Sequence, residues 1–488
     1  MQLLEELITI DHQADTPIYL QITNAFIHNI RLGRLRKGLK LPGSREVADL
    51  LRINRMTMVA AYDELQAQGW IEMAPRRGTF IKKDLPILSP KRIDAVQHAF
   101  TIPGKPLFPL DERKIIPVSA SEFPEAGKII FNDGFPDSRL APVEELIRSM
   151  RSFAKLSVHK KYLMYGGAQG TGLLRETLAE FLSDTRGLPI TPGNILITRG
   201  AQMGIYLAAS IVLDPGDPII VGEPGYSGAN LTFIQLGARI HSVPVDEDGI
   251  NIDAVEKLCR SKKIRMVYVI PHHHNPTTVT LTPERRIRLL ELSVKYKFAI
   301  IEDDYDYDFH YSSKPMMPMA SLDRHGTVIY IGTLTKTLAP AIRIGFMVAP
   351  ESFIRQATSL RKALDTQGDS LIENAIAGLY KDGVITRHIK KSVRLYKERR
   401  DHLCRLLQEE LGRHVSFRTP EGGMSVWTQF PHTDMVKLSR AAYGKGLIIR
   451  DGTEYDTPTR KYNSVRLGFA SLNFKEQEQA VDIIKRLV

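Results

Sequence analysis

The apolar residues in the first part of the chain recur with the period of an α-helix. In "PIYLQITNAFIHNIRLG" an apolar residue stands at every fourth position, and Gly33 ends the pattern. "LPGSREVADLL" predicts a short second helix with Ser44 as its N-cap, and "INRMTMVAAYDELQAQG" predicts a third that ends at Gly69. The residues expected to be buried are Ile18, Ile22, Phe26 and Ile30 in the first helix, Val47, Leu50 and Leu51 in the second, and Met58, Tyr62 and Leu65 in the third.

A hairpin is predicted next, because "WIEMAPRRGTFIKK" has two short extended runs around a turn that carries two arginines. Three helices and a basic hairpin are typical of a winged helix-turn-helix, whose third helix enters the major groove while the wing contacts phosphates. The candidate DNA contacts are Arg45, Asn54, Arg55 and Thr57 at the helix starts, and Arg76, Arg77 and Thr79 on the wing. Charge and periodicity alone also allow a helical protein-interaction module with solvated arginines.

Charge and proline content divide the chain. Between Arg31 and Arg55 there are eight Lys or Arg residues against two acids, and the whole chain of 488 residues carries a formal charge of +11, which permits contact with a polyanion. Residues 84–127 contain six prolines before Pro124 and no sustained period, which predicts a linker. We therefore expect a DNA-binding domain over 1–83, a linker over 84–127 and a second domain over 128–488.

Beyond residue 128, short β-rich runs alternate with amphipathic helical stretches, which predicts an α/β domain with a mostly parallel sheet. The ligand of such a sheet lies beyond the carboxyl ends of its strands, so the residues after each run are the candidates for a site. After "NILIT", "PIIVG", "VYVIP", "FAII" and "VIYIG" these are, in order, Gly200, Ala201 and Gln202; Tyr226; Asn275; Asp303 and Tyr305; and Thr333, Lys336 and Arg343.

Each candidate alone has an ordinary structural explanation, but together they meet the needs of pyridoxal 5′-phosphate. That cofactor requires a lysine for a Schiff base, an acid for its pyridine nitrogen, donors for its phenolic oxygen, and helix N–H groups or cations for its phosphate. The triplet His272, His273 and His274 does not predict a metal site, because consecutive residues cannot all face one ion and no second ligand cluster exists.

Two resemblances support this interpretation. "LPGSREVADLL", "NRMTMVAAYDELQAQGWI" and "RRGTFI" resemble the GntR-type winged helix, and "GTLTKTLAPAIRIG", "EDDYD", "NPT", "EPGY" and "YGGAQGTGLLR" resemble the fold-type I aminotransferases. The second resemblance implies that Lys336 forms the Schiff base, that Asp303 pairs with the pyridine nitrogen, and that Tyr226 stacks on the ring. It further implies Asn275 and Tyr305 at the phenolic oxygen; Gly200, Ala201, Gln202, Thr333, Arg343 and the partner's Tyr165 at the phosphate; and Arg466 at a substrate carboxylate.

The fusion of these two parts is similar to the MocR class of bacterial transcription regulators. The resemblance implies a homodimer that binds paired half-sites on double-stranded DNA and senses an amine, an amino acid or pyridoxal phosphate through an internal aldimine at Lys336. A working aminotransferase with an added DNA-binding domain is the alternative, and Asn275, which true aminotransferases keep, favours retained chemistry. A third possibility is a DNA binder whose second domain is a cofactor-free dimeriser.

The remaining composition favours a cytoplasmic protein without a membrane partner. Cys259 and Cys404 are the only cysteines and lie far apart in the sequence, so no disulfide framework is expected. The first residues lack a cleavable apolar core, and no apolar run approaches the length of about 18 residues that spans a membrane.

Overall fold

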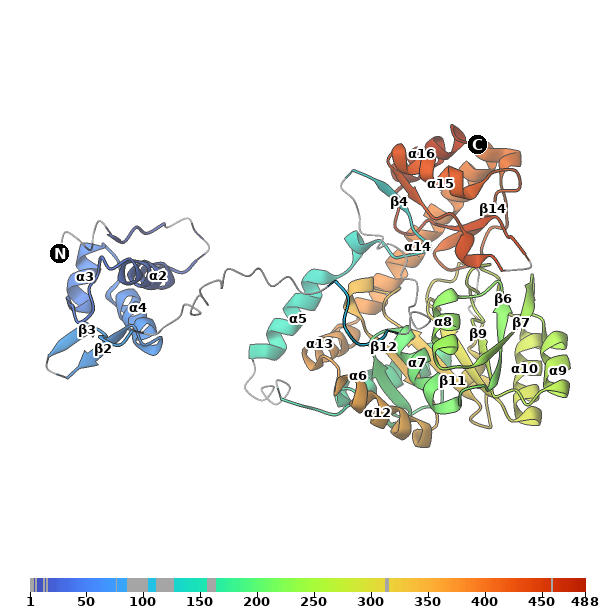
Figure 1. The fold of residues 1–488 in the computed structure, drawn as a ribbon, viewed down its shortest axis with the longest axis horizontal. Coiled ribbons are helices and arrows are strands. Elements are labelled where there is room, and N and C mark those ends of the chain that lie inside the picture. Colours follow the sequence, from blue (N-terminus) through green and yellow to red (C-terminus); the bar gives the residue numbers. More distant parts are fainter. Residues whose placement is uncertain are drawn as a thin grey trace. The chain divides into compact units, whose positions relative to one another are not determined.

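The chain divides into two compact units, Met1–Leu110 and Asp111–Val488, in the computed structural model (Figure 1). The structure describes residues 4, 7–11, 14, 16–75, 77–85, 104–110, 127–155, 164–311, 316–457 and 460–488. The division between the units falls inside the stretch that the sequence predicts as a linker. Arg76 of the predicted wing lies outside the described residues.

The first unit packs three helices against a small antiparallel sheet. The helices are α2 (Ile18–Arg31), α3 (Ser44–Leu50) and α4 (Arg55–Ala67), and the strands β1 (Lys40–Leu41), β2 (Ile71–Ala74) and β3 (Gly78–Ile81) lie in the order β1-β3-β2. Phe26 of α2 and Tyr62 of α4 meet edge to face in the core, with ring centroids 6.0 Å apart. The predicted winged helix-turn-helix fold is confirmed.

The predicted start of α3 is off by one residue. Gly43, and not Ser44, is the N-cap, and its N–H donates to Oε2 of Glu46 at 3.3 Å. Glu46 accepts from the N–H of the N-cap residue itself, which is a different donor from the first-turn N–H that a serine hydroxyl would have satisfied. Strand β1 was not predicted either, since two residues carry no periodicity and become a strand only by pairing with β3.

The second unit is built on an eight-stranded sheet in the order β5-β12-β11-β10-β9-β6-β7-β8. Its strands are β5 (Ile195–Thr198), β6 (Pro218–Glu223), β7 (Arg239–Asp246), β8 (Gly249–Ile250), β9 (Met266–Val269), β10 (Ala299–Asp304), β11 (Val328–Thr333) and β12 (Gly345–Val348). The pairs β7–β6, β6–β9, β9–β10 and β10–β11 are parallel, as predicted, whereas β12 is antiparallel to both β11 and β5.

Helices cover both faces of this sheet (Figure 1). Ile197 and Tyr330 pack into the core with α6 (Gly172–Arg186) and α13 (Ser370–Lys381), while Leu196 and Ile331 pack with α7 (Ala201–Val212), α8 (Ser227–Gln235) and α12 (Glu351–Asp365). Burial on both faces explains why the strands read as continuous apolar runs. The other helices against this part are α5 (Val143–Lys155), α9 (Ile252–Ser261), α10 (Pro283–Tyr296) and α11 (Met319–Leu322). No helix of the described residues is long and apolar enough to cross a membrane.

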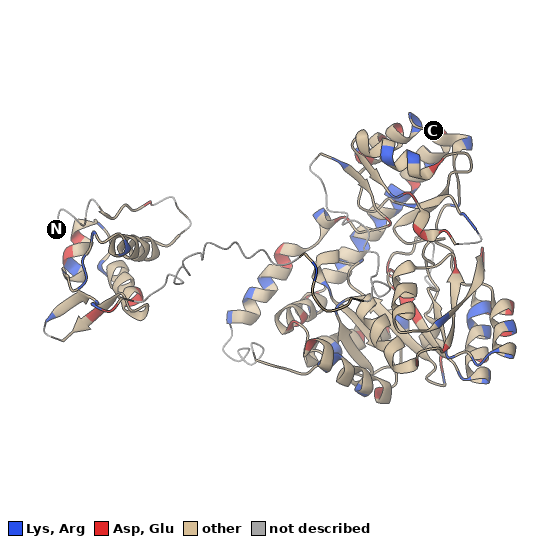
Figure 2. Ribbon diagram, in the orientation of Figure 1, with Lys and Arg blue, Asp and Glu red and all other residues tan. Residues whose placement is uncertain are grey.

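A smaller C-terminal layer completes the second unit. It contains α14 (Val384–Leu406), β13 (Ser416–Phe417), β14 (Ser425–Gln429), α15 (Met435–Gly444), β15 (Leu447–Ile449), β16 (Ser464–Gly468) and α16 (Phe474–Lys485). Strand β4 (Ile129–Phe131), from the start of the unit, joins this layer by pairing in parallel with β15. Lys and Arg residues, blue in Figure 2, lie on both units.

One buried ion pair ties the segment after β4 to α14. Arg399 donates from Nη1 to Oδ2 of Asp137 at 2.9 Å and also to the carbonyl oxygen of Ala470. Both charged side chains are almost fully buried. Loss of one partner therefore leaves the other charge without compensation in a water-poor environment.

We expect Asp137→Ala to lower the free energy of unfolding of the second unit by about 3 kcal/mol, since it strands the Arg399 guanidinium. Urea unfolding followed by the fluorescence of Trp427, in a Trp70→Phe background that silences the first unit, measures the change. Asp434→Ala is the matched control, because it removes an exposed helix cap and should lower the free energy of unfolding by less. Equal losses in the two variants would contradict the importance of the buried pair.

Candidate functional site

A cavity of about 410 Å³ lies where the strands of the large sheet end and the C-terminal layer begins. Most of the predicted cofactor residues line it: Ala201, Gln202, Tyr226, Asn275, Asp303, Tyr305, Thr333, Lys336 and Arg343, together with Arg466. Gly200 is the N-cap of α7, directly before the lining residue Ala201. Tyr165 does not line the cavity and is 86% exposed.

Lys336 follows β11 and is held by the segment after β4. Its Nζ donates to the carbonyl oxygen of Gly134 at 2.7 Å and lies 4.2 Å from the ring centroid of Phe135. Burial lowers the pKa of the Lys336 amine, because an ammonium is poorly solvated there. An amine that loses its proton more readily is a better nucleophile toward a carbonyl carbon.

Asp303, near the end of β10, has a buried carboxyl group of which only one oxygen has a hydrogen-bond partner among the described residues. Oδ2 accepts a hydrogen bond from the hydroxyl of Tyr268 at 2.7 Å, whereas the buried Oδ1 receives none from the part of the chain that the structure describes. Burial raises the pKa of Asp303 to about 7. A buried acceptor without a donor is rare in folded proteins and fits a ligand that brings an N–H group, such as a protonated ring nitrogen.

The start of α7 forms an anion site together with Arg343. Gly200 has a φ of +79°, and a Cβ placed there would lie 3.0–3.2 Å from the atoms of the Arg343 guanidinium. Glycine therefore allows both the backbone turn and the close approach of the cation. Arg343 Nη2 donates to the carbonyl oxygen of Arg199 at 2.8 Å, and the hydroxyl groups of Thr333 and Thr335 lie 2.9 Å apart. Helix N–H groups, hydroxyls and a guanidinium together suit a phosphate.

Tyr305 and Arg466 contact each other at the wall of the same cavity. The Tyr305 hydroxyl donates to the carbonyl oxygen of His273 at 2.8 Å and accepts from Arg466 Nη2 at 3.4 Å. Arg466, on β16, also donates to the carbonyl oxygens of Asp133 and Pro276 at 2.9 and 3.4 Å. These hydrogen-bond partners are neutral oxygens, so the guanidinium can still form a hydrogen-bonded ion pair with an acidic ligand, although the charge of Asp133 also acts on it.

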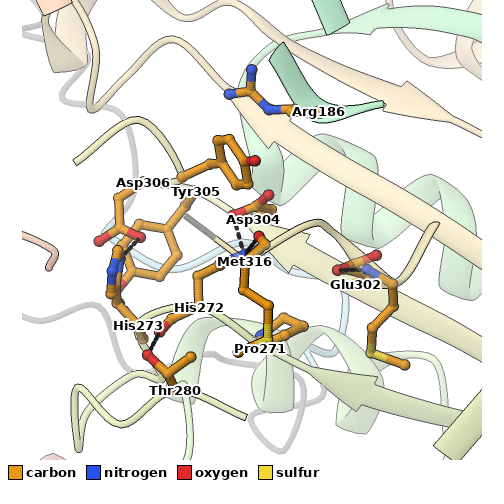
Figure 3. A network of polar contacts seen from close by, with 12 residues as sticks. Arg186, Pro271, His272, His273, Thr280, Glu302, Asp304, Tyr305, Asp306 and Met316 are labelled. Atoms are coloured by element: carbon orange, nitrogen blue, oxygen red, sulfur yellow. Dashed lines mark hydrogen bonds and ion pairs between the residues drawn. The ribbon is translucent and has the colours of Figure 1, made fainter. Parts of the chain in front are cut away.

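Of the three consecutive histidines, His272 and His273 belong to a buried polar network beside the site (Figure 3). Nδ1 of His272, His273 and His274 lies 3.2, 2.7 and 3.1 Å from Asp304, Asp306 and Thr277, respectively. In the same network the carboxylate of Glu302 accepts from the backbone N–H groups of Met319 and Ala320, both at 2.8 Å. These contacts fix the turns that carry Tyr305 and Asn275.

Sequence reasoning missed several residues of the cavity wall: Asp133, Phe135, Arg450, Glu454 and Tyr455. Asp133 follows β4 and Arg450 follows β15, so both obey the rule that ligand-binding residues come after strands. Their strands were overlooked because each has only three residues. Tyr268, whose hydroxyl donates to Asp303, was missed because a tyrosine inside an apolar run is expected to be a core residue.

The candidate DNA contacts of the first unit lie at helix starts and on the hairpin. Arg45 and Arg55 are exposed in the first turns of α3 and α4, and Arg77 is exposed in the turn between β2 and β3. Asn54 is exposed as well, but its side-chain oxygen accepts from the N–H of Met56 at 2.8 Å and thus caps α4. Thr57 and Thr79 are half-buried.

Comparison with known proteins finds a matching family for each of the two units. Residues 127–484 match the family of class I and II aminotransferases, and residues 18–81 match the gntR family of bacterial regulatory proteins. The probable rhizopine catabolism regulatory protein MocR of Rhizobium meliloti is 27% identical over 484 residues, which cover 98% of this chain and 95% of that protein. Aromatic-amino-acid aminotransferase 1 of Thermococcus litoralis is 32% identical over 387 residues, which cover 77% of this chain and 92% of that enzyme.

The second unit is also similar to a solved aminotransferase structure. LysN, the α-aminoadipate aminotransferase of Thermus thermophilus, was crystallised with N-(5′-phosphopyridoxyl)-L-leucine and superposes with a TM-score of 0.69 at 26% identity, covering 74% of this chain and 92% of that one. The unpaired Oδ1 of Asp303, the anion site at α7 and the buried Lys336 fit pyridoxal phosphate as the cofactor. The chain therefore belongs to the class I and II aminotransferase family and carries a gntR-family DNA-binding domain in front, which is the MocR-type fusion.

Proposed function

We propose that this protein is a DNA-binding transcription regulator that senses an amine, an amino acid or pyridoxal phosphate at Lys336. The observation that carries the proposal is the presence, in one chain, of a cavity lined by most of the predicted cofactor residues and a winged helix with exposed arginines at its helix starts. The match to a MocR regulator over 98% of the chain supports it.

Pyridoxal phosphate supplies an aldehyde that condenses reversibly with primary amines. In the proposed site the chain contributes the amine of Lys336, and the carboxyl group of Asp303 holds the proton of the ring nitrogen. The start of α7, with Gln202, Thr333 and Arg343, binds the phosphate, while Tyr226 covers the ring and Asn275 and Tyr305 lie at the phenolic oxygen. Arg466 binds the carboxylate of an incoming amino acid.

The segment after β4 offers a route from this site toward the DNA-binding unit. Its backbone accepts hydrogen bonds from Arg466 at Asp133 and from Lys336 at Gly134. A ligand that engages these two cations competes with the backbone for their hydrogen bonds. Since the chain before this segment leads to the first unit, displacement of the segment acts on the linker, and the two binding events become coupled.

A homodimer is part of the proposal. Tyr165 is an exposed aromatic residue outside the cavity of its own chain, as expected for a side chain that completes the phosphate site of a partner subunit. Two winged helices joined by such a dimer would bind paired half-sites, because a two-fold symmetric protein matches a repeated DNA site.

An active aminotransferase is the second candidate, favoured by the 32% identity to an aminotransferase and by Asn275 at the cavity wall. Lys336, Asp303 and Arg466 serve both functions equally. A cofactor-free dimeriser is the least favoured, since it gives no reason for a buried lysine beside an unpaired carboxyl oxygen.

Lys336→Ala should abolish the covalent link to pyridoxal phosphate and leave a folded protein that still binds DNA. Mass spectrometry after borohydride reduction measures the link, and Lys263→Ala, a change of an exposed lysine, is the control. A reducible cofactor adduct that persists in Lys336→Ala would show that the wrong lysine has been assigned.

Arg55→Ala should weaken binding to the DNA upstream of the protein's own gene by roughly tenfold, and Arg77→Ala should lower the salt dependence of binding by about one phosphate contact. Titration of labelled DNA at several salt concentrations measures both effects. Arg413→Ala, at an exposed arginine of the second unit, should change neither. Unchanged affinity and unchanged salt slope in both wing and helix variants would refute the DNA-binding assignment.

One experiment on the cofactor-loaded protein distinguishes a regulator from an enzyme. Amino acids are supplied with a keto acid acceptor, while the amino acid product and the affinity for DNA are followed in parallel. A regulator should show a change in DNA affinity with turnover that is slow or absent. Sustained turnover with unchanged DNA affinity would favour the aminotransferase.

A further inference from the structure

Asp133 is an acidic residue of the cavity wall that none of the proposed cofactor contacts uses. It follows β4, and its carbonyl oxygen, not its carboxylate, receives the hydrogen bond from Arg466. Oδ1 of its carboxylate is buried and accepts no hydrogen bond from any residue that the structure describes. A buried carboxylate oxygen without a donor is costly, and a polar ligand in the cavity would remove that cost.

Asp133 keeps its negative charge in spite of this burial. Burial alone would raise its pKa, but the positive charges of Lys336, Arg466 and Arg450 outweigh that effect and hold the pKa of Asp133 below its ordinary value. Lys336 is the strongest of these three cations. Its ammonium charge is also the one that changes when the amine is committed to the cofactor.

The other charged groups of the wall have partners of their own. Glu454 is bound by Arg450, whose Nη1 lies 2.6 and 2.8 Å from its two carboxylate oxygens. In the proposed function Asp303 serves the ring nitrogen, Arg343 the phosphate and Arg466 a ligand carboxylate. Once these groups are paired in this way, Asp133 is the one acid of the described cavity wall that has no cationic partner of its own.

We propose that Asp133 recognises a second cationic nitrogen on the ligand, so that the ligand is a diamino monocarboxylic acid. One amine reacts at the cofactor, the carboxylate lies on Arg466, and the distal ammonium pairs with Asp133. A second carboxylate in place of that ammonium would meet the charge of Asp133 and be repelled. This inference rests on the proposed amine sensing at Lys336 and adds the class of ligand.

The test compares L-lysine with L-norleucine, which lacks only the distal ammonium, and with L-glutamate. Each is titrated into the full chain loaded with pyridoxal phosphate, and the absorption of the cofactor gives the dissociation constant. Lysine should bind roughly tenfold or more tightly than norleucine, as expected for one charge-assisted hydrogen bond, and glutamate should bind most weakly.

Asp133→Asn should reduce the preference for lysine over norleucine to about threefold or less, because it removes one charge and keeps the shape. Glu247→Gln, at an exposed acid, is the matched control and should keep the preference. Equal binding of lysine and norleucine by the wild-type protein would overturn the inference and needs no variant. A preference that survives Asp133→Asn would overturn it as well.

Failure of the proposed amine sensing would give a different result from failure of the inference about Asp133. If no amine alters the cofactor absorption, amine sensing at Lys336 is refuted together with the inference. If norleucine and lysine alter the absorption and the DNA affinity alike, sensing stands and only the role of Asp133 is lost.

Discussion

The parallel pairing of β10 with β11 is the constraint on which the site depends. The register places Asp303 opposite Ile331, so the carboxyl group and Lys336 leave neighbouring strands at the same edge of the sheet. Both strands are buried on their two faces, and a slip by one residue would exchange the side chains that pack into the two cores, where each is fitted to its neighbours. The register is therefore fixed by packing energy, and the relative position of acid and lysine follows from it without any contact between them.

Much of this arrangement is predictable because its signals are local. The runs before Gly200, Tyr226, Asn275, Asp303 and Lys336 are long and apolar, and parallel sheets collect the residues after such runs at one edge. The helices of the first unit were equally clear from their period. Only the exact cap of α3 was wrong, because Gly43 takes the N-cap position, with its N–H bound by Glu46, and Ser44 is already the first helical residue.

The features that escaped prediction depend on partners far away in the sequence. Strands β4 and β15 have three residues each and gain their structure from pairing with one another. Asp133 and Arg450 could not be placed in the cavity without that pairing. The antiparallel β12 was missed for the same reason, since a short apolar run gives no direction. The hydrogen bond from Tyr305 to the carbonyl oxygen of His273 likewise reflects the folded turn and not the residue types.

The pairing of Ile129 with Leu447 also orders events during synthesis. The first unit contains all of its own strands and helices and can fold as soon as it leaves the ribosome, since domains generally fold as units from the N-terminus. The wall that carries Asp133 must wait until β15 has been made, near the end of the chain. A ribosome that stops early would thus release a protein with a finished first unit and an unfinished second unit.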